Sequence, residues 1–367
     1  MGRKRFHCIF PMGENVHLIK DVGMIPYVLQ KEGYYDSYIS FYEKAENLPY
    51  LKNEVKGLNY KPIKRIFKNN DFNVFLFLFS NFRKMDYVMM FHPSFKKIFI
   101  CFLFKILSFN RLKFYFKLDL DESIFQSDVT RKTFVNSFKK KLYNYTALFT
   151  AETKKINDFL NNGSYFNTKY LTNGFINTKP SNPPVEKENI LLTVGRIGSY
   201  QKNTEVLLDA IKNINLLDWK IVIIGPIEED FIPIVDEFFL SNPSLKQNVY
   251  FLGSVSDRDQ LEEYYQKSKV FVLTSRYEGF PLVFTEAIKN GCFIVSSDLV
   301  CAIDITNNEE FGRLFPIGNS QELSFILQNV IDGNTCLPPK ESIMKYAEEN
   351  YNWSVLVRRL YELLESK

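Results

Sequence analysis

Residues 270–298, VFVLTSRYEGFPLVFTEAIKNGCFIVSSD, decide the fold of the second half of the chain. The run from Val270 to Ser275 has the apolar, β-branched and aromatic content of a buried parallel strand. A polar loop follows, and Pro281 stands where the first turn of a helix tolerates proline. Gly291 is placed to end that helix, and residues 293–296 resume as a strand. The pattern predicts a strand–helix–strand unit whose loop lies at the carboxyl end of a parallel sheet, where such folds bind ligands.

Two glutamates mark this unit, Glu278 in the loop and Glu286 eight positions later on the predicted helix. A glutamate on the first turns of the helix can face the same crevice as the loop. By spacing alone the two glutamates could equally lie on a solvent-exposed face. Their role is therefore judged from the surrounding residues.

The surrounding residues fit S-x-x-E-G-F-P-L-V-x-x-E-A-x-x-x-G. This pattern resembles the donor-sugar signature of the retaining, family-4-type glycosyltransferases, also described as glycosyl transferases group 1. The resemblance implies an α/β protein of GT-B fold, with two Rossmann-like domains facing across a cleft. It also implies that Glu286 binds the ribose of a nucleotide-sugar donor and that Glu278 faces the transferred sugar as the principal catalytic carboxylate. The donor-binding loop would comprise Gly279, Phe280, Pro281 and Leu282, of which Pro281 has no N–H to donate.

A second donor-binding element is expected after an earlier strand. Gly195 and Arg196 follow an apolar run, and Lys202 stands just before a predicted helix. This arrangement resembles the family's V-G-R and K-G phosphate clamp, with Asn203 where the family usually has glycine. A guanidinium and an ammonium can neutralise a leaving diphosphate. We therefore expect no cofactor and a metal-independent reaction.

The net charge of +4 conceals an asymmetry. Residues 1–170 carry 28 Lys and Arg against 15 Asp and Glu, whereas residues 171–367 carry 18 against 27. The first half is thus suited to an anionic partner, and an anionic membrane surface is the expected one. No nucleic-acid-binding motif accompanies the basic residues, so nucleic acid is not an expected partner.

The cysteine and histidine spacing favours neither a disulfide framework nor a metal site. The five cysteines are scattered, and the three histidines lie far apart. The N-terminus lacks a long apolar stretch with a cleavage site, and the apolar segment 95–109 is too short to cross a bilayer. These features predict a cytoplasmic protein, held peripherally on the inner face of the plasma membrane.

The first half predicts strands at 5–10, 38–42, 74–79, 87–91, 114–120, 147–152 and 169–172, with a helix from about His17 to Lys31. In the GT-B resemblance the first loop faces the acceptor, which suggests Gly13, Asn15 and His17 as acceptor-side residues. An ordinary strand–helix turn explains the same residues.

Relatives carry a catalytic-site histidine where this chain has Asp119. Asp119 could hydrogen-bond a sugar or act as a base, or could be structural. His92, after the preceding strand, could serve in its place. The sequence leaves open whether Asp119 or His92 acts in catalysis.

Four segments are expected from these patterns. Residues 1–174 would form the acceptor-binding domain and residues 175–189, rich in proline, a linker. Residues 190–340 would form the nucleotide-sugar-binding domain, and the helix within 341–367 would pack back on the first domain.

The resemblance implies a retaining glycosyltransferase that moves a sugar from a nucleotide diphosphate sugar to a lipid-linked or polysaccharide acceptor. Cell-surface polysaccharide biosynthesis is the expected setting. A GT-B nucleotide-sugar epimerase and a non-catalytic GT-B partner subunit are the alternatives. The sequence names neither the sugar, the base, the acceptor nor the oligomeric state.

Overall fold

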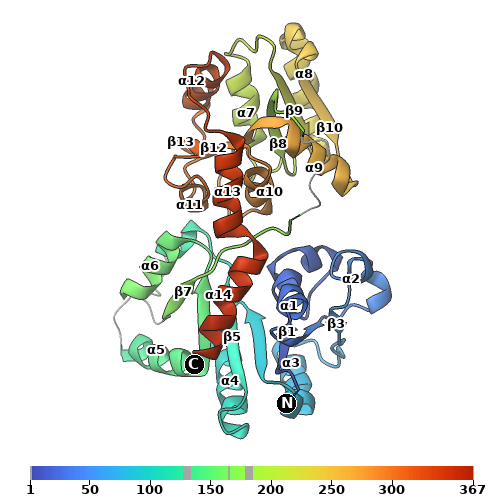
Figure 1. The fold of residues 1–367 in the computed structure, drawn as a ribbon, viewed down its shortest axis with the longest axis vertical. Helices are drawn as coiled ribbons and strands as arrows, with labels where there is room; N and C mark the ends of the chain where they lie inside the picture. The colour runs from blue at the N-terminus through green and yellow to red at the C-terminus, as the bar shows by residue number, and fades with distance from the viewer. Residues whose placement is uncertain (1, 127–133, 164–165, 178–184, 367) are drawn as a thin grey trace. The chain divides into compact units, whose positions relative to one another are not determined.

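The computed structural model describes residues 2–126, 134–163, 166–177 and 185–366. The chain divides into two compact units (Figure 1). Unit 1 comprises Met1–Ile176 and Tyr351–Lys367, and unit 2 comprises Asn177–Asn350. Of the segment expected to be a linker, residues 178–184 lie outside the described residues.

Unit 1 is built on a seven-stranded parallel sheet in the order β3-β2-β1-β4-β5-β6-β7. The strands are β1 (Arg5–Ile9), β2 (Asp36–Ser40), β3 (Asn59–Tyr60), β4 (Tyr87–Phe91), β5 (Lys113–Leu118), β6 (Ala147–Ala151) and β7 (Thr168–Tyr170). All residues of β4 and β6 are buried, which explains why these strands read as continuous apolar runs.

The helices of unit 1 are α1 (Asp21–Lys31), α2 (Tyr50–Asn53), α3 (Asn70–Asn81), α4 (Phe95–Leu107), α5 (Phe134–Thr146), α6 (Lys154–Gly163) and α14 (Trp353–Glu365). The predicted strand at 74–79 was wrong, because this segment lies inside α3. An apolar run of this length does not separate a strand from a buried helix. The local signal was Asn69, whose side chain caps the helix by accepting a hydrogen bond from the Phe72 N–H.

The segment predicted as one helix from His17 to Lys31 is divided in the structure. A 3-10 helix spans Asn15–Ile19, Lys20 has an extended backbone (ψ 179°), and α1 starts at Asp21. The Asp21 carboxylate accepts a hydrogen bond from the Val22 N–H at the new helix start. The apolar periodicity continues across this break, so the sequence pattern did not indicate that the helix is divided.

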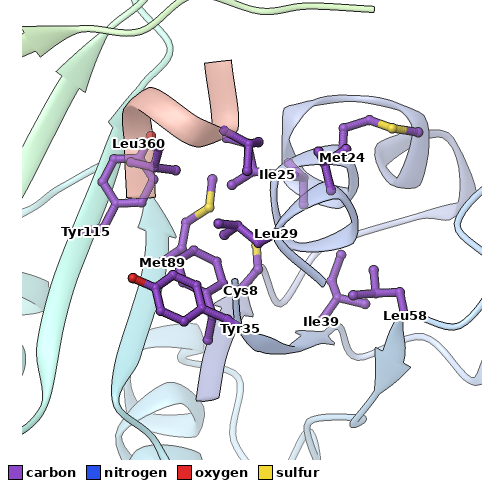
Figure 2. Packing of buried hydrophobic residues seen from close by; sticks show 14 of the residues in the cluster. Cys8, Met24, Ile25, Leu29, Tyr35, Ile39, Leu58, Met89, Tyr115 and Leu360 are labelled. Atoms are coloured by element: carbon purple, nitrogen blue, oxygen red, sulfur yellow. The ribbon is translucent and has the colours of Figure 1, made fainter. Parts of the chain in front are cut away.

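The end of the chain belongs to the core of unit 1. Trp353, Leu356 and Leu360 of α14 are buried against α1 and the sheet, and Figure 2 shows Leu360 beside Ile25 and Tyr115. Asn352 caps α14 by accepting a hydrogen bond from the Ser354 N–H. The helix before it, α13 (Lys340–Tyr351), was not predicted and lies almost wholly in unit 2.

Unit 2 has a six-stranded parallel sheet in the order β10-β9-β8-β11-β12-β13. The strands are β8 (Glu188–Val194), β9 (Lys220–Ile224), β10 (Val249–Gly253), β11 (Ser268–Leu273), β12 (Phe293–Ser297) and β13 (Gly312–Phe315). Its other helices are α7 (Thr204–Ile211), α8 (Ile232–Ser241), α9 (Arg258–Lys267), α10 (Leu282–Lys289), α11 (Val300–Ile305) and α12 (Ser320–Ile331).

The strand–helix–strand unit predicted from residues 270–298 is confirmed as β11, α10 and β12. Gly291 follows α10 with φ +72°, and an added Cβ would lie 2.7 Å from Cβ of Lys340, so glycine is required there for two reasons. Pro281 is the N-cap of α10 rather than its first residue. Both α11 and β13 were missed because their short segments carry no distinct periodicity.

The helices that the structure describes are all too short, or too polar, to cross a lipid bilayer.

Candidate active site

The sheet of unit 2 changes direction between β8 and β11. From β8 the chain continues to β9 and β10 on one side, and β11 continues to β12 and β13 on the other. The loops that leave the carboxyl ends of β8 and β11 therefore border one crevice, the usual ligand site of open α/β sheets. The candidate donor-site residues lie in these two loops and on α10.

Glu278 is the centre of a hydrogen-bonded cluster. Its Oε1 accepts from the Lys202 ammonium at 2.5 Å and from the Ser275 hydroxyl at 2.8 Å. Its Oε2 accepts from the Gln201 side-chain amide at 3.1 Å. The side chain of Glu278 is only 9% exposed and that of Lys202 17%, so the ion pair is held partly out of water.

Gln201 extends this cluster to Arg196. The Arg196 guanidinium donates to Oε1 of Gln201 at 3.2 Å, and the Gln201 amide also donates to the carbonyl of Tyr277 at 3.1 Å. Arg196 itself is solvent-exposed. Arg196, Lys202 and Glu278, which sequence reasoning selected separately, are thus joined through Gln201, which it missed. The only sequence signal for Gln201 was its position directly before Lys202.

The backbone segments that directly follow β8 and β9 lie in close contact. The Gly195 N–H donates to the Ile224 carbonyl at 2.9 Å. A Cβ added to Gly225 would lie 1.7 Å from the Gly195 carbonyl oxygen, and one added to Gly195 would touch the Lys202 side chain at 3.4 Å. Of these two glycines, only Gly225 is required by close backbone approach, since a Cβ at position 195 would make an ordinary contact with Lys202.

Asn203, the departure from the family's usual glycine, has φ +50° and ψ +48° at the start of α7. Asparagine tolerates the left-handed region better than other residues with a side chain. The backbone geometry explains why asparagine can stand where relatives have glycine.

The second predicted carboxylate, Glu286, lies on α10. Its Oε2 accepts a hydrogen bond from the Tyr265 hydroxyl at 3.0 Å. Burial, together with the Glu286 charge, raises the pKa of Tyr265, so the phenol stays a donor. Glu286 is half-buried and bonds to Tyr265, whereas Glu278 bonds to Lys202, Ser275 and Gln201, so the two carboxylates have separate surroundings.

The loop between Glu278 and α10 contains Gly279, Phe280, Pro281 and Leu282. The Phe280 ring is buried and anchors the loop. Pro281 precedes α10, which has no side-chain cap at its first turn. The first N–H groups of a helix have no partner within it, and together with the helix dipole they favour an anion. Leu282 begins this turn.

These groups suit a phosphorylated polyol. Arg196 and Lys202 supply positive charge, α10 supplies N–H donors, and Glu278 and Glu286 supply acceptors for hydroxyl groups. Among the residues that the structure describes, no cluster of three or more His, Cys, Asp or Glu side chains could hold a metal ion.

The sheet of unit 1 has its own change of direction between β1 and β4. Three predicted acceptor-side residues follow β1, and each makes a structural contact. Gly13 packs against the Phe41 ring, where a Cβ would lie 2.3 Å away. Asn15 accepts a hydrogen bond from the Tyr50 N–H at 2.9 Å, and His17 Nδ1 accepts one from the Glu14 N–H at 3.0 Å.

His92 follows β4 and lines a pocket of about 580 Å³ with residues of the first loop and of α3. It is exposed and has φ +51°, an uncommon backbone conformation for histidine. None of the three residues of the first loop predicted to bind acceptor lines this pocket, whereas Pro11 and Met12 do.

Asp119 follows β5 next to a buried ionic network. The fully buried Lys117 ammonium pairs with Glu152, lies 3.4 Å from an Asp21 oxygen and donates to the Asn173 side-chain oxygen at 2.9 Å. Although Asp119 is exposed, partial loss of hydration and the Asp21 charge raise its pKa. Sequence reasoning did not anticipate the network, because a lysine inside a strand gives no sign of its partners.

With this geometry established, comparison with known proteins identifies the domain. Residues 175–353 match the family described as glycosyl transferases group 1. This segment of the chain is therefore similar to glycosyl transferases group 1. The match covers unit 2, so the Arg196, Lys202 and Glu278 cluster lies within the matched segment.

Curated relatives align over parts of the chain. The amylovoran biosynthesis glycosyltransferase AmsD of Erwinia amylovora is 38% identical over 103 residues, 28% of this chain and 27% of that protein. The poly(glycerol-phosphate) alpha-glucosyltransferase of Bacillus subtilis is 28% identical over 240 residues, 61% of this chain and 34% of that protein. The chain therefore spans about a third or less of the length of these two relatives.

Solved structures match over the whole chain. Anabaena HepE in complex with UDP superposes with a TM-score of 0.73 at 16% identity, covering 99% of this chain and 100% of that one. The lipopolysaccharide outer core galactosyltransferase WaaB has a TM-score of 0.70 at 17% identity, with 99% of both chains covered. The protein has the GT-B fold, as the sequence predicted.

Proposed function

We propose that the protein is a retaining glycosyltransferase that takes a sugar from a nucleotide diphosphate sugar. The observation that carries this proposal is the Arg196–Gln201–Lys202–Glu278 cluster at the strand switch of a group 1 domain. It places two cations and a carboxylate in adjacent loops, as a diphosphate and a sugar require. The UDP named for the HepE structure makes a uridine nucleotide the first donor to test.

In the proposed reaction, the bond between the anomeric carbon and the diphosphate oxygen breaks, and its electron pair leaves with the phosphate. Arg196, Lys202 and the N–H groups of α10 stabilise the negative charge that develops there, without a metal. The acceptor hydroxyl oxygen bonds to the same face of the anomeric carbon, and its proton passes to the departing phosphate oxygen. Glu278 holds the sugar and stabilises positive charge on its ring.

The acceptor is proposed to be lipid-linked, within cell-surface polysaccharide assembly. One relative is named for this chemistry, the Campylobacter jejuni transferase of a diphospho-undecaprenol substrate, 26% identical over 149 residues. These residues are 40% of this chain and 38% of that protein. The excess of basic residues in the first half of the chain is consistent with an anionic lipid carrier.

A peripheral site on an anionic bilayer is part of the same proposal. Helix α4 leaves a stripe of apolar side chains exposed at helical spacing, namely Phe95, Phe99, Leu103 and Ile106. Helix α5 packs beside α4 and carries Lys139, Lys140 and Lys141. An apolar stripe next to basic residues is typical of helices that bind anionic lipid surfaces.

The test is calorimetric titration of the full chain with UDP, GDP, ADP and CMP in the presence of chelator. One diphosphate should bind, and Lys202→Met or Arg196→Ala should weaken it about tenfold to a hundredfold, as expected for loss of a charge-assisted contact. Lys246→Met, an exposed lysine of unit 2, is the charge-matched control. Unchanged binding in both clamp variants would refute this donor site.

Glu278→Gln separates the enzyme from a non-catalytic subunit. The variant releases Lys202 from its ion pair, so the diphosphate should bind at least as tightly as in the wild type. Turnover should fall by at least about a hundredfold, because the sugar loses its carboxylate partner. Undiminished transfer by Glu278→Gln would contradict the proposed role.

A further inference from the structure

The 580 Å³ pocket of unit 1 has a defined place in its fold. It lies at the carboxyl ends of β1 and β4 and at the first turns of α3 and α4, where the sheet of unit 1 changes direction. Its size is in the range of small-molecule sites, and it is large enough for one or two sugar rings.

The pocket has an apolar floor. Val74, Met90 and Phe91 are buried, and Ile9 and Phe10 continue the surface from the first strand. A floor of this kind can pack against the C–H face of a sugar ring, which is the less polar side of a polyol.

The rim of the pocket carries polar groups that the protein itself leaves uncommitted. The side chains of Asp71 and His92 form no hydrogen bond or ion pair within the described part of the chain. Among the residues that the structure describes, the Lys97 ammonium donates only to the carbonyls of Phe91, at 3.4 Å, and His92, at 3.1 Å. Asn70 accepts from the Tyr42 hydroxyl at 3.1 Å, which leaves its amide NH₂ to donate elsewhere.

The charges of the rim decide which ligand fits. One carboxylate and one ammonium cancel, and the remaining polar side chains are the His92 imidazole and the amides of Asn69 and Asn70. A phosphate would gain from Lys97 but would be repelled by Asp71, whereas hydroxyl groups can donate to Asp71 and accept from Lys97 and Asn70. The mixture of donors and acceptors therefore matches an uncharged polyol better than an anion.

The backbone of His92 gives independent support. A residue other than glycine with positive φ is conformationally strained, and such residues concentrate at ligand sites. Here the left-handed turn at His92 comes directly after β4 and just before Ser94, which caps α4 by accepting from the Lys97 N–H. The same turn places His92 and Lys97 on one pocket.

We propose that this pocket binds the uncharged terminal sugar of the acceptor, with Asp71, His92 and Lys97 as its specificity-determining residues. The inference rests on the proposed glycosyltransferase function and adds the acceptor's chemistry and its site. It assigns acceptor recognition to the pocket rather than to Gly13, Asn15 and His17, which are engaged in local packing and capping.

The experiment is saturation-transfer NMR on the full chain with UDP present at saturation. The probes are the methyl α- and β-glycosides of glucose, galactose, mannose, N-acetylglucosamine and N-acetylgalactosamine, and the corresponding sugar 1-phosphates. At least one neutral glycoside should bind. Asp71→Asn should weaken that binding by about tenfold, the loss of one charge-assisted hydrogen bond.

Asp71→Asn also distinguishes a sugar from a phosphate. If the pocket holds a phosphate, removing the carboxylate will strengthen binding of the 1-phosphates, and Lys97→Met will abolish that binding while leaving the binding of neutral glycosides intact. Either result overturns the proposal. Absence of any neutral glycoside binding overturns it too. Asp158→Asn and Lys52→Met change equivalent charges elsewhere in unit 1 and should have no effect.

Failure of the inference can be separated from failure of the proposed function. UDP binding, measured in the same samples, should be unchanged in Asp71→Asn and His92→Ala. If UDP binds and no glycoside does, only the pocket assignment is wrong. If UDP does not bind the wild type, the donor site itself is wrong.

Discussion

Glu278 shows how the candidate site is assembled at the level of single residues. In the free protein its two oxygens are occupied by Lys202, Ser275 and Gln201. A nucleotide diphosphate would compete for Lys202 and a sugar for Glu278. Ligand binding should therefore exchange an internal ion pair for contacts with the donor, which keeps both charged groups partnered in each state.

His7 is a buried histidine that should make unit 1 sensitive to acid. Both ring nitrogens lack hydrogen-bond partners within the described part of the chain, and the ring stacks on Tyr38 with a centroid distance of 4.5 Å. Burial, aided by the charges of Lys61 and Arg5, lowers the pKa of His7 to about 3. Below its unfolded pKa of about 6.5 the unfolded chain binds the proton more readily, so stability is lost as pH falls.

The expected loss is about 2 kcal/mol between pH 7 and pH 5. Urea unfolding across this range, in a Trp219→Phe background so that Trp353 reports on unit 1, measures it. His7→Phe should retain the stacking and remove this part of the acid dependence. His92→Gln, at an exposed histidine, should leave the dependence intact, and a persistent slope in His7→Phe would disprove the assignment.

At the level of elements, the turn between β8 and α7 has a conformation that few residues accept. Asn203 is left-handed, is only 1% exposed and has an amide nitrogen without a hydrogen-bond partner. Asn203→Gly should therefore be neutral or stabilising by up to about 1 kcal/mol, because it removes both the strain and the unpaired group. Asn203→Ala should destabilise unit 2 by about 1–2 kcal/mol, since alanine retains the strain of the left-handed turn.

Hydrogen exchange of unit 2 amides across a urea series measures these two effects. Asn213→Gly, at an exposed position after α7, is the control and should change stability by less than about 1 kcal/mol. Equal destabilisation by glycine and alanine at position 203 would show that the Asn203 side chain, rather than the backbone geometry, matters.

The same level explains which elements were predictable. Strand β4 was predicted at its observed bounds and β11 within two residues of them, because a clear turn or loop sequence follows each strand. The segment 74–79 was mistaken for a strand although Asn69 caps a helix there. For this segment, the capping residue at its start indicated the secondary structure better than the apolar run did.

At the level of the whole molecule, the charge asymmetry has a structural counterpart. The basic residues of the first half accompany the exposed apolar stripe of α4, from Phe95 to Ile106. Vesicles containing phosphatidylglycerol should co-sediment with the protein, and pure phosphatidylcholine vesicles should bind it much less. Raising the salt concentration should weaken the interaction, because it screens the attraction to anionic lipid.

Phe99→Ser combined with Leu103→Ser should weaken vesicle binding by about tenfold or more, because two apolar side chains no longer enter the bilayer. Leu240→Ser, on α8 of unit 2, changes a side chain that is 77% exposed and should have no effect. If vesicle binding is unaffected by both lipid charge and the α4 substitutions, the exposed stripe of α4 is not the membrane-binding surface.

The sequence by itself determined the parallel α/β architecture, because most strands, turns and helix starts are encoded within a few neighbouring residues. The GT-B fold was predicted from the resemblance of residues 275–291 to a known family, and the donor-loop residues remain a prediction. Only the tertiary structure showed that Gln201 joins Arg196 to Glu278 and that Lys117 is buried among acidic residues. Such contacts connect positions far apart in the chain, and no local pattern specifies which partner a polar or apolar side chain will find.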